Sequence, residues 1–175
     1  PSSVAAQSVQ NKDGALDSQQ LLSLKILSEL NNLGGALRSE GDQEISAGSF
    51  NNQNGMTSSR GSLKVETQQL DNDSGTLISQ GSAVFNANSL NNTHGKIHSG
   101  NALSIAGEQI TNTAGKIVST KDLGLQAETL KNSGNGSSSS QAGMRVDTTR
   151  RINREGGAVR GTGPSTVEAD REGAS

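Results

Sequence analysis

The sequence predicts an all-β fold, a right-handed parallel β-helix built from coils of about 20 residues. Three observations predict it. The chain repeats itself every 20 residues from Leu30 onward, apolar and polar residues alternate within each repeat, and asparagine and glycine recur between the alternating stretches. A period of two is typical of a strand, because alternate side chains face opposite sides. Each repeat therefore supplies two or three short strands joined by turns, which is one coil of a solenoid.

The composition favours a narrow, repetitive core over a compact globule. Only 29% of the 175 residues are hydrophobic and 1% are aromatic, so the large side chains that fill a wide interior are lacking. The net charge of −2 is smaller than is typical of disordered chains. Nucleic-acid-binding proteins need a basic surface and aromatic platforms, and membrane spans need long apolar runs. We therefore expect a folded chain with no nucleic-acid partner and no membrane-spanning segment.

One column of the repeat consists entirely of asparagine. Successive coils of a solenoid lie ~4.8 Å apart, the spacing of hydrogen-bonded strands. Amide side chains stacked at that spacing can hydrogen-bond to one another along the axis. We therefore predict an asparagine ladder that braces one corner of the coil. Its members are Asn32, Asn52, Asn72, Asn92, Asn112 and Asn132.

A second column, close after each asparagine, consists of glycine. Glycine adopts positive φ at no steric cost, and asparagine tolerates the left-handed region. We therefore expect these glycines to supply the positive φ of the turn beside the ladder. They are Gly35, Gly55, Gly75, Gly95 and Gly115.

The remaining columns describe the interior. A column of small residues, which includes Ala47 and Ala87, indicates a tight corner of the core. A serine column is expected to stack in the same way as the asparagines. The two apolar columns contain Leu30, Phe50, Leu70, Leu90, Ile110 and Leu130, and Ile45, Val65, Phe85, Ile105 and Leu125.

The repeat also extends toward the start of the chain, provided that one coil has an extra residue. Val9 and Asn11 then match Leu30 and Asn32, so the β-helix is expected to begin before Val9. Residues 21–30 (LLSLKILSEL) are ambiguous, because leucines three apart also suit an amphipathic α-helix. Their alternation on the core columns favours a strand.

The pattern loosens after residue 132. The stretch SGNGSSSSQAG is typical of a flexible loop, while INREGGAVRG echoes the earlier LNNLGGALRS. We therefore predict a β-helix over 1–132, a Gly/Ser-rich loop that can include one degraded coil over 133–162, and a disordered tail over 163–175.

The C-terminal part holds six of the eight arginines. They could dock an anionic glycan or an acidic partner through their charge. The alternative is a solvated tail whose arginines are balanced by nearby acidic residues. The candidate partner-binding residues are Arg145, Arg150, Arg151, Arg154 and Arg160.

No motif points to catalysis, a metal or a cofactor. Asp71 and Asp73 have the spacing of a calcium loop, but Ser82 stands where the distal glutamate is required. His94 and His98 would share a metal on a helix but not on a strand and turn. The acidic residues fall in different columns, unlike the paired carboxylates of glycoside hydrolases. We expect no enzyme activity and no cofactor.

The tandem pattern, as in LNNTHGKIHSGNALSIAGEQITNTAGKIVST, resembles the haemagglutinin repeats of filamentous haemagglutinin and of contact-dependent inhibition toxins. The resemblance covers residues 9 to 132. It implies a very long exoprotein of a Gram-negative bacterium, exported by an outer-membrane partner transporter in two-partner secretion and displayed at the cell surface. The Asn-Pro-Asn motifs of that family's secretion domain do not occur here.

This resemblance leaves two expected roles. The first is a structural shaft that holds a receptor-binding or toxic tip away from the cell. The second is a direct adhesin that binds a host glycan or protein through one face of the coil, or through the arginine-rich C-terminal part.

Overall fold

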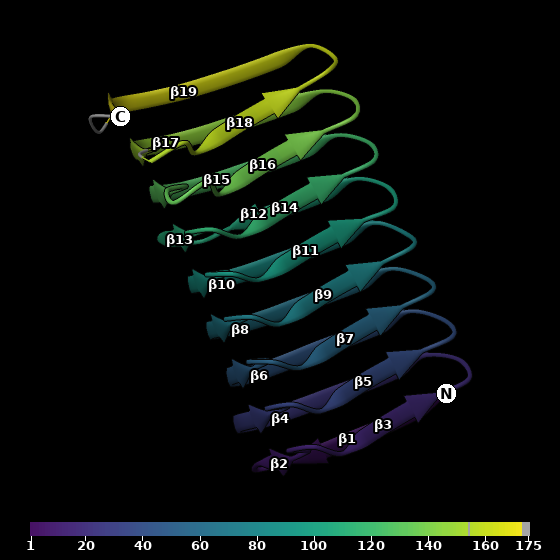
Figure 1. Ribbon diagram of the computed structural model, residues 1–175. Helices are drawn as coiled ribbons and strands as arrows, with labels where there is room; N and C mark the ends of the chain where they lie inside the picture. Colours follow the sequence, from purple (N-terminus) through teal and green to yellow (C-terminus); the bar gives the residue numbers. More distant parts are fainter. Residues whose placement is uncertain (154, 173–175) are drawn as a thin grey trace.

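The structure, a computed structural model, describes residues 1–153 and 155–172. These residues form strands and turns, with no helix that could cross a membrane. The strands are parallel and stack into a solenoid of about eight turns (Figure 1). They are β1 (Ser2–Ala6), β2 (Val9–Gln10), β3 (Ala15–Ser18), β4 (Leu22–Asn31), β5 (Ala36–Ser39), β6 (Gln43–Asn51), β7 (Met56–Ser59), β8 (Leu63–Asp71), β9 (Thr76–Ser79), β10 (Ala83–Asn91), β11 (Lys96–Ser99), β12 (Leu103–Ala106), β13 (Gln109–Thr111), β14 (Lys116–Ser119), β15 (Leu123–Lys131), β16 (Ser137–Ser140), β17 (Met144–Ile152), β18 (Ala158–Gly161) and β19 (Ser165–Glu172).

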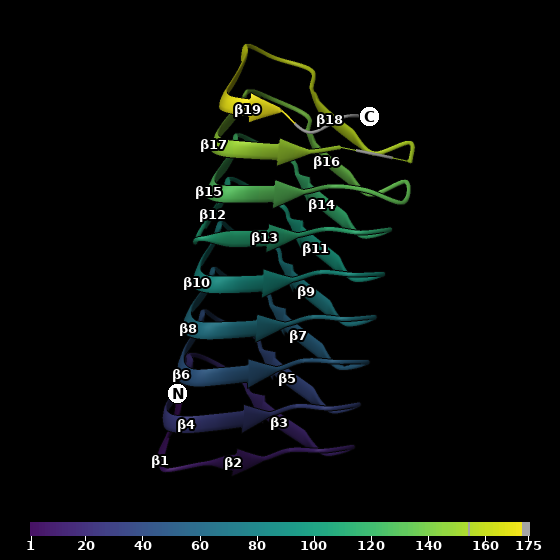
Figure 2. The ribbon, with the colours of Figure 1, turned by 90° about the vertical axis from the view of Figure 1, so that its left-hand side faces the viewer.

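Each coil contributes a long strand to one sheet and a short strand to another. The long strands form an eleven-stranded sheet that runs from β1 to β19, and the short strands form an eight-stranded sheet from β3 to β18 (Figure 2). Strands β6 and β8 are paired as far as Ala47 and Thr67 and are paired again from Ser49 and Gln69 onward, so one residue of each strand between them is unpaired. The column of small residues therefore lies at a corner that divides each long strand into two parts.

Successive coils stack in the register that the columns predict. Leu70 lies beside Phe50 on one side and Leu90 on the other. Every residue of the two apolar columns is at most 2% exposed. Burial of apolar area contributes roughly 25 cal/mol per Å², so these columns form the core and the predicted parallel β-helix is confirmed.

One coil near the start of the chain has an extra residue. Leu22 to Ile26 pair with residues 21 positions later, whereas the pairing from Glu29 onward is 20 positions later. The insertion is a bulge, and it leaves Leu27 78% exposed. Residues 22–31 form strand β4, so the strand interpretation of this stretch is correct.

The solenoid continues past residue 132, through the stretch for which we predicted a loop that can include one degraded coil. The serine run forms strand β16, and β17 pairs with strands on both sides. Serine suits a narrow core because it is small and its hydroxyl finds acceptors. Ser138 Oγ donates to Asn132 Oδ1 (3.4 Å), and Ser140 Oγ donates to the Lys121 carbonyl (2.6 Å). Strand β19 occupies most of the predicted tail, and residues 173–175 lie outside the described part.

One polar side chain interrupts the core. Gln43 lies in register between Leu22 and Leu63 and is 0% exposed. Its Nε2 donates to the Ser58 carbonyl (3.0 Å), whereas its Oε1 accepts no hydrogen bond. A buried acceptor without a donor costs about 1–3 kcal/mol. Gln43 is therefore a weak place in the core.

We predict that Gln43→Leu raises the free energy of unfolding by about 1 kcal/mol, because it completes an apolar column and removes the unpaired oxygen. Denaturant unfolding followed by circular dichroism measures the change. Gln80→Leu replaces an exposed side chain and should leave the midpoint unchanged. A lower midpoint for Gln43→Leu would mean that the bond to Ser58 outweighs the unpaired oxygen.

Candidate functional site: the stacked asparagine ladder

The predicted asparagines lie on top of one another at one turn of every coil. The Nδ2 of each donates to the Oδ1 of the next at 2.7–2.8 Å, from Asn32 through to Asn132. All six side chains are 0% exposed. The structure adds Asn11 at one end (2.8 Å) and Asn153 at the other (3.1 Å). The ladder therefore spans the described length of the solenoid.

Each ladder amide also binds the backbone of the following coil. Asn92 Nδ2 donates to the Lys116 carbonyl (3.1 Å), and Asn132 Nδ2 donates to the Ala158 carbonyl (2.8 Å). The amide thus uses both of its protons, one toward the next side chain and one toward the next strand. Buried amides are tolerated only when they are satisfied in this way. The ladder ties a side chain and a strand of each coil to the coil before it.

The glycine column is required by close approach rather than by positive φ. A Cβ added at Gly75 would lie closer than 3.0 Å to the Asn52 carbonyl oxygen and to Asn72 Oδ1, and the other glycines of the column meet equivalent atoms. The left-handed conformation belongs to the preceding residue, as at Ser74 (φ 56) and His94 (φ 53). The expectation that the column glycines supply positive φ is therefore wrong. The left-handed residue of the turn lies one position earlier. The glycine is required because atoms of the ladder asparagines leave no room for a Cβ.

A second column, outside the core, was missed from the sequence. Asn31, Asn51, Asp71 and Asn91 each accept a hydrogen bond from the backbone N–H two residues later, at 2.9–3.1 Å. These Asx turns fix the backbone that leads into the ladder. The signal was visible as an Asn or Asp directly before the first four ladder asparagines, from Asn32 to Asn92. Asp71 therefore has a role in a turn, and in 1–153 and 155–172 no three His, Cys, Asp or Glu side chains gather as metal ligands do.

The serine column braces another turn. Ser39 Oγ donates to the Gly41 carbonyl (2.9 Å), and Ser59 Oγ donates to the same carbonyl from the next coil (2.7 Å). Ser99 bonds the carbonyls of Gly81 and Ala102 in the same manner. These serines are at most 4% exposed. Their hydroxyls mostly satisfy turn carbonyls instead of one another, so this column works differently from the asparagine ladder.

The structure separates the candidate arginines. Arg145 lies in register with Gly124 on the eleven-stranded sheet, and Arg151 lies in register with Leu130 of an apolar column. Arg150 pairs with Thr129. Arg160 is on β18 of the other sheet, and Arg154 lies outside the described residues. The described arginines therefore do not form one cluster.

Charged side chains elsewhere form exposed ion pairs between coils. Arg38 Nε donates to Asp17 Oδ1 (2.7 Å), and Arg60 pairs with Glu40 (2.9 Å). The hydrogen bond with Asp17, and then its negative charge, raise the pKa of the Arg38 guanidinium above its usual value. Exposed pairs of this kind contribute little stability.

The family comparison agrees with this coil geometry. Residues 2–50, 38–107 and 85–170 each match the haemagglutinin repeat model. The chain belongs to the haemagglutinin repeat family. The haemagglutinin repeats reach residue 170, in agreement with the coils that continue past residue 132. No curated protein and no solved structure matches the chain.

We predict that Asn92→Ala destabilises the haemagglutinin repeat by about 3–5 kcal/mol, because it removes several hydrogen bonds and leaves one proton of Asn72 Nδ2, together with Asn112 Oδ1, buried without a partner. Asn72→Ala should behave alike. Asn86→Ala is the control, since Asn86 is exposed on β10. Thermal and denaturant unfolding check the prediction. Unchanged midpoints for both ladder variants would rule out a stabilising ladder.

We also predict that Gly95→Ala costs about 1–3 kcal/mol, because its Cβ would displace the backbone of the neighbouring coil. Gly124→Ala is the matched control. A Cβ at Gly124 meets nothing within 4 Å, so this variant should be neutral or slightly stabilising. Equal unfolding midpoints for the two variants would show that close approach does not explain the glycine column.

Proposed function

We propose that this segment is a structural shaft of a secreted bacterial surface exoprotein, which holds a distal part of that protein away from the cell. The observation that carries the proposal is the ladder, which recurs in every coil from Asn11 to Asn153. Each coil adds ~4.8 Å along the axis. Each added repeat therefore extends the segment further along its axis.

The arrangement of hydrogen bonds supports stiffness. Bending the solenoid would have to lengthen ladder bonds or strand pairing on one side of the coil. Both are buried, and a buried polar group that loses its partner costs about 1–3 kcal/mol. Many such bonds act in parallel along the axis, so the segment resists bending. The haemagglutinin repeat and the β-solenoid fold are structural rather than catalytic.

The family resemblance extends the proposal to export. An outer-membrane partner transporter would deliver the chain to the exterior of a Gram-negative cell. Each coil contacts mainly its neighbours, so coils can add in sequence as a solenoid chain emerges. The chain has no cysteine and needs no disulfide chemistry for this assembly.

A second candidate function is direct adhesion to an anionic host glycan. Outside the ion pair of Arg38 with Asp17, the outward side of the eight-stranded sheet carries Lys96, His98, Lys116 and Arg160. From β5 to β18 its strands contain no carboxylate. A surface with charge of one sign attracts an oppositely charged partner.

Removal of one whole coil from the full-length exoprotein tests the shaft proposal. Deletion of residues 83–102 joins Ser82 to Leu103, which occupies the column of Ala83. We predict retained surface display and tip function, with a shaft shorter by ~4.8 Å. Deletion of residues 83–92 is the control, because it removes strand β10 and the ladder residue Asn92 without removing a whole coil, and it should abolish display. Loss of tip function after the 20-residue deletion, with display retained, would contradict a spacer.

A glycan array with the isolated chain separates the two candidate functions. The shaft proposal expects no saturable binding. Saturable binding to an anionic glycan that Lys96→Glu with Lys116→Glu abolishes would establish the adhesin function instead.

A further inference from the structure

The first part of each long strand presents a flat outward surface with an ordered charge pattern. We call it the long-strand face, defined by two outward positions per coil. Lys64 and Glu66 occupy both positions of one coil (3.4 Å apart), and Arg145 and Asp147 occupy both positions of a later coil. The coils between them carry only uncharged side chains at these positions, which are Val84, Asn86, Ser104, Ala106, Gly124 and Gln126.

We propose that the long-strand face pairs with the same face of a second copy, with the two solenoid axes parallel. A two-fold axis parallel to the solenoids keeps each coil opposite its own counterpart and exchanges the two outward positions. Lys64 then faces Glu66 of the second copy, and Arg145 faces Asp147. An isologous interface of this type is self-complementary. Both coils that carry two charges meet opposite charges, while the single charges of the earlier coils, Lys25 and Glu44, face Ser23 and Ser46 of the second copy.

The antiparallel alternative is disfavoured by the same residues. Centred on Val84, where all nine long strands overlap, it sets Lys25 opposite Asp147 but leaves Lys64, Glu66 and Arg145 opposite uncharged side chains. Centred on Ser104, it sets Lys64 opposite Arg145 and Glu66 opposite Asp147, and like charges oppose association. The parallel pair matches both Lys64 with Glu66 and Arg145 with Asp147, so it has the larger number of opposite-charge pairs.

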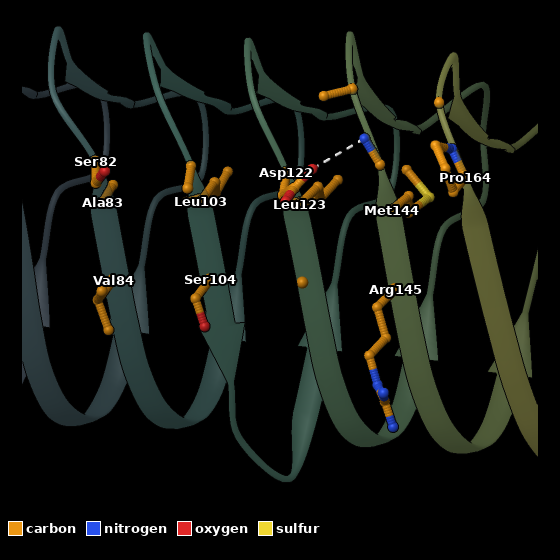
Figure 3. Close-up of a pocket in the computed structure, with 15 residues that line it drawn as sticks. Ser82, Ala83, Val84, Leu103, Ser104, Asp122, Leu123, Met144, Arg145 and Pro164 are labelled. Atoms are coloured by element: carbon orange, nitrogen blue, oxygen red, sulfur yellow. Dashed lines mark hydrogen bonds between the residues drawn. The ribbon is translucent and has the colours of Figure 1, made fainter.

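The shape of the face suits a partner of this kind. Val84, Ser104 and Arg145 project in a row from β10, β12 and β17, with β15 between the last two strands, and a hollow lies along the row (Figure 3). Gly124 has no side chain to fill the hollow, and an added Cβ there meets nothing within 4 Å. In the parallel pair the longer side chain of Gln126 from the second copy lies over Gly124. At this coil a larger side chain therefore lies opposite the glycine.

The area is also adequate. Five residues at ~3.3 Å across nine strands at ~4.8 Å give a face of about 700 Å² per copy. Specific interfaces bury about 800 Å² per partner, with smaller ones at the weaker end. The eight-stranded sheet is a poorer choice, because Lys96 lies beside Lys116 with no carboxylate from β5 to β18.

Sedimentation velocity across a concentration series tests the proposal on the chain itself. We expect a reversible dimer. Lys64→Glu with Arg145→Glu should sediment as a monomer, because carboxylates then face carboxylates. Exchanging all four charges (Lys64→Glu, Glu66→Lys, Arg145→Asp, Asp147→Arg) should restore the dimer. Lys96→Glu with Lys116→Glu, on the other sheet, should leave it intact.

The orientation of the pair is tested with spin labels, since the chain has no native cysteine. Labels at Ser23→Cys and, separately, at Ser104→Cys should both give short distances between copies in the parallel pair. A short distance at Ser104 alone would indicate antiparallel pairing and overturn the proposal. The proposal would also be overturned if the wild-type chain is a monomer, or if the dimer persists in the variant with Lys64→Glu and Arg145→Glu. Open-ended association through the coil ends would overturn it as well.

Discussion

The hydrogen bond between one buried asparagine amide and the next is the interaction on which the solenoid depends. An amide that is 0% exposed must find partners for its protons and its oxygen, or it costs several kcal/mol. Its partners are the equivalent amide one coil away and a backbone carbonyl of that coil. This requirement sets the register between coils and hence the coil length. It also excludes any Cβ at the neighbouring glycine.

Departures from the 20-residue repeat occur only where the ladder is left intact. The bulge at Leu27 adds a residue at the far corner of the coil, and Asn11 still reaches Asn32. A longer turn between Asn132 and Ser137 moves the later pairing to 21 residues, and Asn132 still reaches Asn153. Insertions are absorbed in loops and corners because those positions carry no interior hydrogen bonds. A shaft built in this way can vary in sequence without losing its continuity.

The core and the surface of the repeat carry different information. Core columns are nearly uniform along the axis, so they specify a rod and its length. Outward columns differ from coil to coil, as the contrast between Lys64 with Glu66 and the uncharged Ser104 with Ala106 shows. Any recognition of a partner by the segment must therefore come from its outward positions. The backbone spaces these positions regularly, and the side chains at them determine which partner can bind.

The sequence by itself determined the repeat, the inward columns and the ladder asparagines, because each is a periodic pattern that stacking turns directly into contacts. Only the tertiary structure decided where the solenoid continues past residue 132. The serines of β16 become core residues there because the ladder residue Asn132 and the Lys121 carbonyl of the preceding coil accept their hydroxyl protons. The composition of the serine run does not show that these acceptors are present. The reason for the glycine column was likewise decided in three dimensions, since the carbonyl that crowds each glycine comes from the coil before it. The candidate arginines are close in sequence but lie at different positions around the coil, because 20 residues of chain wrap a full turn.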